Sequence, residues 1–190
     1  MINDELLFVE SELISLRPAN RSDVPLIYAL RRSSRAKFLN PTSPDISHQY
    51  EYYENYLMRH NSGDEIYFVI CDKRQKRDVG VTRVTNLTQH GRFGWEGLVI
   101  DSDATPGVAI DAIVTIYATG FLGAKKSVCG PWKVPKGHLR VQRLHKNMGI
   151  AKIIDTEREH FIYQALREDF VREWPKFVKQ GFGTKKWSDV

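Results

Sequence analysis

The sequence is poor in cysteine and has no long apolar run. Its 190 residues include two cysteines, Cys71 and Cys129, which lie in separate strand-like segments. Two thiols so placed give neither a disulfide framework nor a zinc-binding pattern, so we expect buried free thiols. No run of about 18 apolar residues occurs, and the acidic residues 1–5 precede no signal-type apolar segment. We therefore expect a cytoplasmic protein without a membrane span.

The sequence also lacks internal repeats, low-complexity segments and blocks of one charge. Lys and Arg number 28 against 23 Asp and Glu, which gives a net charge of +5. The positive residues are scattered, so they favour anionic partners without forming the continuous basic stripe of a nucleic-acid-binding protein. The length and the 42% hydrophobic content suit one domain with its own core.

Strand-like and helix-like runs alternate along the chain. The β-rich runs at 65–72, 78–87 and 92–101 are joined by polar turns, which predicts antiparallel neighbours in one sheet. Further strands are expected at 13–19 and 126–132. Helices are expected at 22–30, 43–60 and 106–121 and in a late segment ending near 150, followed by a closing pair of segments at 150–157 and 159–169. This order predicts a mixed α/β domain.

The stretch 99–121 turns directly from a strand into a helix with little side-chain bulk. Pro106 suits a first helical turn, because its missing N–H would have no partner there. Gly107, Val108 and Ala109 keep the start of the helix small. The free amides of a first turn, with the positive end of the helix dipole behind them, can hold a phosphate. The alternative is an ordinary helix N-terminus.

Three motifs, in this order of elements, carry a family resemblance. They are "ISLRPANRSDV" at 14–24, "TPGVAIDAIVTIYATGF" at 105–121 and "VQRLHKNMGI" at 141–150. The chain from about residue 13 to 169 resembles the GCN5-related N-acetyltransferase (GNAT) family. The resemblance implies a single GNAT-like domain at 1–170, with a central mixed, mainly antiparallel sheet flanked by helices. An amphipathic tail at 171–190 would then pack on the domain or on a partner subunit.

The resemblance implies acetyl-CoA as co-substrate and no metal. The family places a Gln/Arg-x-x-Gly-x-Gly/Ala loop before the pyrophosphate-binding helix, of which this sequence keeps Gly107 and Ala109. Asp101 and Asp103 would repel a pyrophosphate unless they cap the helix or point away. A binding module with a degenerate loop therefore stays an alternative. The expected donor-binding residues are Ile100, Thr105, Pro106, Gly107, Val108 and Ala109.

Glu96 is the expected general base. The family commonly has a glutamate on the strand that leads into the pyrophosphate loop. In this sequence Glu96 alternates with Leu98 and Ile100, which predicts a carboxylate on an apolar strand face. Burial there would raise its pKa toward a useful range. The alternative is a glutamate at a strand edge, paired with Arg83 or Arg92.

His145 is the expected proton donor to the departing thiolate. It lies four residues before Gly149, where many family members have a tyrosine. Val141, Leu144 and Met148 form the apolar stripe of this helix, which predicts that His145 lies beside the core. The nearby helix C-terminus would favour the charged imidazole. A surface histidine without a catalytic role is the alternative.

The acceptor site is expected at the two early helices and the strands beside them. Aromatic rings there can stack on a base or a sugar, and polar groups can bind hydroxyls and phosphates. The region is similar to GNAT members that acylate amino sugars carried on nucleotides for surface polysaccharides, and less so to the branch that acetylates protein N-termini. Core packing is the alternative for Tyr53. The expected acceptor-binding residues are Phe38, Asn40, His48, Gln49, Tyr53 and Arg83.

The predicted function is transfer of an acetyl group from acetyl-CoA to a primary amine, expected on a nucleotide-linked amino sugar. Protein N-termini are the competing acceptors. No nucleic-acid partner is expected, and a homodimer stays open. The C-terminal segment 174–190 looks appended, so a chain ending at Glu173 would stay folded if that segment is peripheral.

Overall fold

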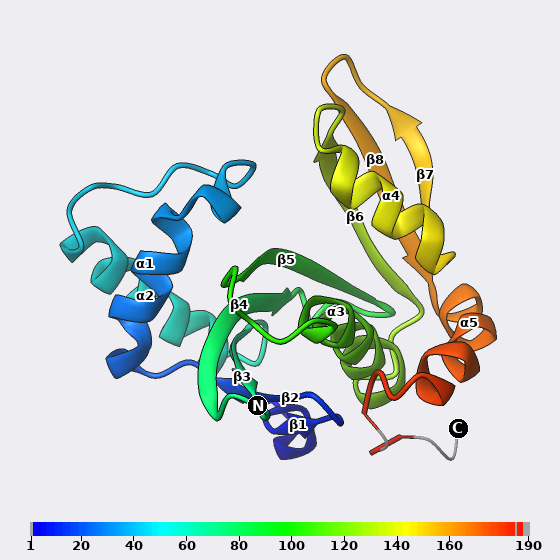
Figure 1. Cartoon of the computed structure of the whole chain (residues 1–190), viewed down its shortest axis with the longest axis horizontal. Coiled ribbons are helices and arrows are strands. Elements are labelled where there is room, and N and C mark those ends of the chain that lie inside the picture. The colour runs from blue at the N-terminus through cyan, green and yellow to red at the C-terminus, as the bar shows by residue number, and fades with distance from the viewer. Residues whose placement is uncertain (1, 185, 188–190) are drawn as a thin grey trace.

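The computed structural model describes residues 2–184, 186 and 187, which form one eight-stranded sheet with helices on both faces (Figure 1). The strand order is β1-β2-β3-β4-β5-β6-β8-β7. Every neighbouring pair is antiparallel except β5 and β6, which are parallel. The strands are β1 (Val9–Glu10), β2 (Ile14–Pro18), β3 (Ile66–Asp72), β4 (Arg77–Thr85), β5 (Arg92–Ile100), β6 (Val128–Pro135), β7 (Ala151–Thr156) and β8 (His160–Leu166).

Five α-helices accompany this sheet within the described part of the chain. Short 3-10 turns precede or follow some of them, and a π-helical turn, Thr119–Gly123, continues the third. None of these helices is both long and apolar enough to cross a membrane. The helices are α1 (Val24–Arg32), α2 (Ser47–Asn61), α3 (Val108–Ala118), α4 (Leu139–Met148) and α5 (Arg167–Lys179).

The predicted fold class, a mixed and mainly antiparallel sheet flanked by helices, is confirmed. Each face of the sheet has its own core. Helices α1 and α2 cover one face, where Ile27 and Tyr56 pack against strand residues such as Val81. Helix α3 lies on the other face and is buried on nearly all sides, as expected for a helix that is apolar all round. Cys129 is buried in that second core and Cys71 is half-buried.

The sheet splays open between β5 and β6. These strands pair only at Arg92↔Val128 and Phe93↔Cys129. Beyond Cys129 the chain of β6 continues through Pro131, which has no N–H to donate to a neighbouring strand. Strands β6, β7 and β8 with helix α4 therefore lean away from the rest of the molecule (Figure 1). The opening between β5 and β6 positions the candidate site.

The C-terminal segment, which was expected to pack on the domain or on a partner subunit, contributes to the core of its own chain. Helix α5 runs without a break through the predicted domain boundary at 170/171 and buries Trp174, which is 8% exposed. The chain then returns along α3, where the backbone N–H of Gly183 donates to Asp111 Oδ1 at 2.6 Å. Asp111 is fully buried and also accepts bonds from Ser11 Oγ and the Leu13 N–H. The segment packs on its own domain.

Candidate active site

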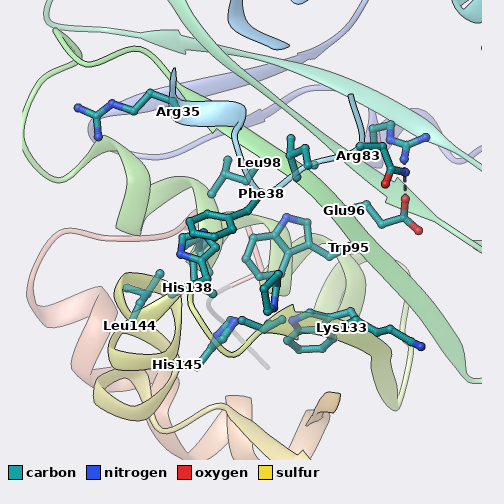
Figure 2. A pocket seen from close by; sticks show the side chains of 18 of the residues that line it. Arg35, Phe38, Arg83, Trp95, Glu96, Leu98, Lys133, His138, Leu144 and His145 are labelled. Atoms are coloured by element: carbon teal, nitrogen blue, oxygen red, sulfur yellow. Dashed lines mark hydrogen bonds and ion pairs between the residues drawn. The ribbon is translucent and has the colours of Figure 1, made fainter. Parts of the chain in front are cut away.

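A cleft of about 550 Å³ lies where β5 and β6 separate (Figure 2). One wall comes from β5, the other from β6 and α4, and the loop between α1 and α2 reaches over it. The charged groups that line it are four cations and one carboxylate: Arg31, Arg35, Arg83, Lys133 and Glu96. Apolar and aromatic residues form the rest of the lining, including Phe38, Trp95, Leu98, Ile113, Trp132, Val141 and Leu144.

A second cavity of about 290 Å³ adjoins this cleft. The two share Arg31, Asn40 and Arg83, so these three residues stand between them. The other walls of the second cavity come from the α1–α2 loop and from the first turns of α2: Pro41, Thr42, Ser43, His48, Gln49 and Tyr52. The two cavities therefore meet at Arg31, Asn40 and Arg83.

The loop between α1 and α2 is held in place from both ends. Arg31 donates from Nε to Thr42 Oγ1 at 3.1 Å and from Nη2 to the Asn40 carbonyl at 2.9 Å. On the cleft side, the Phe38 ring stacks on His138 with centroids 4.0 Å apart and planes inclined by 20°. His138 precedes α4, so this stack bridges the two halves of the molecule across the cleft (Figure 2).

Glu96 lies at the rim of the cleft, and the expectation of an apolar, buried position is wrong. Its side chain is 52% exposed and pairs with Arg83 at 2.5 Å (Figure 2). The reason is a bulge at Gly97, which has φ +70° and shifts the register between β4 and β5. The extra residue reverses the alternation. Leu98 and Ile100 therefore pack toward α3, whereas Glu96 shares the α1–α2 face with Arg83.

Arg83 is the hub of a polar network behind the cleft. It donates to the hydroxyl of Tyr52 and contacts Glu65, which is 3% exposed and also pairs with Arg59 at 2.5 Å. Burial lowers the pKa of Arg83, but Tyr52, Glu65 and Glu96 together raise it above its ordinary value. Arg83 therefore stays charged between the two cavities.

His145 is buried rather than beside the core, with 2% of its surface exposed. Trp132 and Tyr163 lie against its ring at centroid distances of 5.5 and 4.8 Å, and Trp95 is at 6.3 Å. Burial, helped by the charge of His138, lowers its pKa to about 4. The expected effect of the helix C-terminus is thus outweighed, and the ring is neutral at pH 7. Its Nδ1 is buried and has no hydrogen-bond partner among the described residues.

Two aromatic residues of the cleft, Trp95 and Trp132, were not among the predicted site residues. Trp95 reaches it from β5 and is fixed by a bond from its Nε1 to Thr82 Oγ1 at 2.9 Å. Trp132 reaches it from β6. The signal in the sequence was available, since both tryptophans are large side chains beside a glycine or a proline in a strand. Only the splay shows that they face each other.

The start of α3 offers free backbone donors. Among the described residues, the N–H groups of Gly107, Ala109 and Ile110 have no acceptor. Gly107 caps the helix in the left-handed conformation with φ +97°. The N–H of Thr105 is used, because it donates to Asp72 Oδ2 at 2.8 Å. These amides can bind an anionic group such as a pyrophosphate.

Asp101, one of the two acidic residues before α3, is not a free charge at these amides. Asp101 pairs with Arg77 at 2.8 Å and accepts the N–H of Asp103. Of the other residues predicted for the donor, Val108 is buried, Pro106 is exposed, and Ile100 packs against the core beneath α3. The N-terminus of α3 therefore fits an anionic donor group without an opposing unpaired carboxylate from Asp101.

The residues predicted for the acceptor divide into three groups. The structure brings Phe38, Asn40 and Arg83 to the cleft. It places His48 and Gln49 at the second cavity. Tyr53 is buried in the core beneath α2, where its hydroxyl donates to the Ala19 carbonyl at 3.4 Å, and it lines neither cavity. Helical spacing alone did not separate Tyr53 from its neighbours, since it is Tyr52 that faces the site.

No group of three or more His, Cys, Asp or Glu residues within the described chain could hold a metal ion. No protein-family model and no curated protein sequence matches this chain. Solved structures do match it. The apo form of FdhC, described as a nucleotide-linked sugar GNAT, covers 91% of this chain and 97% of its own, with 22% identity and a TM-score of 0.81.

Two structures from Vibrio cholerae also match. A spermidine N-acetyltransferase in complex with CoA and spermine covers 84% of this chain and 98% of its own, with 17% identity and a TM-score of 0.68. A candidate ribosomal-protein-serine acetyltransferase covers 87% and 99%, with 10% identity and a TM-score of 0.68. At these identities the likeness concerns the fold. The chain has the fold of the GNAT acetyltransferases.

Proposed function

We propose that this protein is an N-acetyltransferase that moves an acetyl group from acetyl-CoA to the primary amine of a nucleotide-linked amino sugar. The observation that carries the proposal is the charge of the cleft, where four cationic side chains face a single carboxylate. Such a lining attracts an acceptor that carries negative charge, as a sugar nucleotide does through its phosphates. Sugars of this kind supply surface polysaccharides, the setting that we infer for the reaction.

The donor half of the proposal rests on α3 and on the fold. Acetyl-CoA carries a pyrophosphate, and the free N–H groups of Gly107, Ala109 and Ile110 offer it hydrogen bonds at the positive end of a helix. The cleft between β5 and β6 provides room for the thioester arm. A spermidine N-acetyltransferase of the same fold is described in complex with CoA, which supports the choice of donor.

In the proposed reaction, the amine nitrogen attacks the carbonyl carbon of the thioester. The amide bond forms as the carbon–sulfur bond breaks, and coenzyme A leaves as a thiolate. The attacking nitrogen loses a second proton as it becomes the amide, and this balances the proton that converts the thiolate to the thiol. The amine carries a proton at neutral pH, which it must lose before or during the attack. We assign Glu96 as the group that accepts it, because this is the only carboxylate among the residues that line the cleft.

His145 is assigned to the leaving sulfur. Since the pKa of its ring is held near 4, the ring at pH 7 is neutral and carries one N–H. That N–H donates a hydrogen bond to the developing thiolate, within an apolar surrounding that strengthens the interaction. This role differs from delivery of a proton by an imidazolium, which the sequence had favoured.

The charge of the cleft also separates the proposal from its competitors. A polyamine acceptor carries several positive charges, and the cleft cations Arg31, Arg35 and Arg83 would repel it. A protein N-terminus brings a single ammonium group and no phosphates. A binding module without activity is the remaining alternative, and it requires that no amine be acetylated.

The proposal is tested first by binding and then by turnover. Acetyl-CoA should raise the thermal unfolding midpoint in a concentration-dependent way, because a ligand of the folded state stabilises it. Release of coenzyme A is then followed with amino-sugar nucleotides, spermidine and a free-amino-terminal peptide as acceptors. We expect turnover with an amino-sugar nucleotide. No shift with millimolar acetyl-CoA and no turnover with any amine would favour the binding module.

Glu96→Gln tests the assigned base, with Glu54→Gln as a matched control. Both glutamates are about half exposed and pair with an arginine, but Glu54 lies on the outer face of α2 and lines neither cavity. We expect Glu96→Gln to lower kcat/KM by about a hundredfold or more without changing the unfolding midpoint. Equal activity of both variants and the parent would remove Glu96 from the mechanism.

A further inference from the structure

We propose that the second cavity binds the nucleoside end of the acceptor, with the diphosphate lying between the two cavities and the amino sugar in the cleft. This inference rests on the proposed function and divides its acceptor site into three parts. It assigns a specific binding role to Gln49, Tyr52 and His48, none of which touches the cleft.

The shared wall of the two cavities suits a diphosphate. A ligand that occupies both must pass Arg31, Asn40 and Arg83, which belong to both linings. Two of these three are guanidinium groups, which bind phosphate oxygens in fixed geometry. Both Nη atoms of Arg83 are bonded to Tyr52, Glu65 and Glu96, so Arg83 contributes mainly its charge and Arg31 offers the free donor. Arg31 donates from Nε to Thr42 and from Nη2 to Asn40. Its Nη1 makes no hydrogen bond to the described residues. No carboxylate is among the residues that line the second cavity.

Gln49 provides the observation that points to a base. The residue is 7% exposed and lines the second cavity, and its amide makes no hydrogen bond to any described residue. The amide atoms are not sealed from solvent, so at the wall of the cavity they are free to bond a ligand. A carboxamide offers one acceptor and two donors, which match the alternating donors and acceptors on the edge of a nucleobase.

Two aromatic side chains complete the cavity. The hydroxyl of Tyr52 accepts a bond from Arg83, and Nδ1 of His48 lies 2.7 Å from Ser43 Oγ. Both rings are therefore held in position before a ligand arrives, which reduces the entropy lost on binding. Each ring has an apolar surface that can contact the base or the ribose. The cavity thus combines an amide for the base edge with aromatic contact area.

The experiment measures binding of UDP, dTDP, GDP and inorganic pyrophosphate by calorimetry. Coenzyme A is kept at saturation throughout, because its own adenosine diphosphate has similar chemistry and its site must be filled. We expect at least one nucleoside diphosphate to bind ten times more tightly than pyrophosphate. Gln49→Leu should remove this tenfold advantage and leave the affinity for pyrophosphate unchanged, which also shows that the variant is folded. Arg31→Met should weaken both ligands.

Two variants serve as matched controls. Gln89→Leu removes an exposed glutamine and Arg21→Met an exposed arginine, and neither residue lines a cavity. Both should bind every probe within twofold of the parent. If pyrophosphate binds as tightly as every nucleoside diphosphate, or if Gln49→Leu behaves like Gln89→Leu, the nucleoside cavity is wrong.

Turnover separates this inference from the proposed function. Acetylation of an amino-sugar nucleotide without any nucleoside advantage in binding overturns only the division of the acceptor site. A nucleoside advantage that Gln49→Leu abolishes supports the cavity assignment, even if no amine is acetylated. Absence of acetylation with every amine would count against the proposed function and not against the cavity assignment.

Discussion

Lowering the pH from 7 to 5 is predicted to remove about 2 kcal/mol of folding free energy through His145 alone. In the folded protein, burial among Trp132, Tyr163 and Trp95 lowers the pKa of this ring to about 4, against 6.5 when it is unperturbed. Below pH 6.5 the unfolded chain therefore binds a proton that the folded chain does not. Stability is complete above pH 6.5 and falls as the pH approaches 4.

The magnitude follows from the two pKa values. A difference of one pKa unit corresponds to about 1.4 kcal/mol, so the pKa values of 6.5 and about 4 give a full loss of about 3.5 kcal/mol. Between pH 7 and pH 5 a little more than half of this loss takes place, which is about 2 kcal/mol. Because His145 is almost completely buried, solvent screening reduces the effect little.

The assay is urea unfolding of the parent, His145→Phe and His145→Gln at pH 7, 6 and 5. Other titrating groups act on all three proteins, so the difference in unfolding free energy between parent and variant isolates His145. We expect this difference to fall by about 2 kcal/mol from pH 7 to pH 5 for both replacements, whatever their absolute stabilities. Parallel pH profiles for parent and variants would show that the ring titrates normally and would refute the buried, neutral state.

Two further predictions concern the start of α3 and the C-terminal segment. Gly107→Ala should cost more stability than Gly91→Ala and should weaken the binding of acetyl-CoA in thermal-shift titrations. Both glycines have positive φ, but only at Gly107 would a Cβ approach Leu13 and Phe182, at 3.1 and 3.2 Å. Equal losses of stability would mean that this close contact is relieved easily. Ending the chain at Glu173 removes the buried Trp174 and the bond from Gly183 to Asp111, so we expect loss of soluble, folded protein; an unchanged unfolding midpoint would contradict that expectation.

The order of elements was predictable because their periodicity is strong. The three β-rich runs around Phe68, Val81 and Val99 became β3, β4 and β5, and the apolar run at 108–118 became α3. The helix at 167–179 was missed. Its apolar positions at Phe170, Trp174 and Phe177 have helical spacing, but Pro175 lies inside it and argues locally against a helix. Tertiary packing on α3 outweighs that local cost.

The site was less predictable, because it depends on one backbone irregularity and on contacts between distant strands. A single bulge at Gly97 moved Glu96 from the expected apolar face to the exposed rim. An isolated glycine inside a strand is a recognised signal of such a bulge. His145 was misplaced for a different reason. The rings that bury it come from β5, β6 and β8, and no local pattern reports that these strands meet around α4.

The degenerate donor loop argues less strongly against catalysis than its sequence implied. The groups at the start of α3 that can bind a pyrophosphate are backbone N–H groups, which survive most side-chain substitutions. What must be preserved is the left-handed cap at Gly107 and the free N–H groups beside it. Gly107 is retained, and Asp101 is neutralised by Arg77 and turned to the neighbouring backbone. The side-chain differences from the GNAT motif therefore leave these main-chain donors in place.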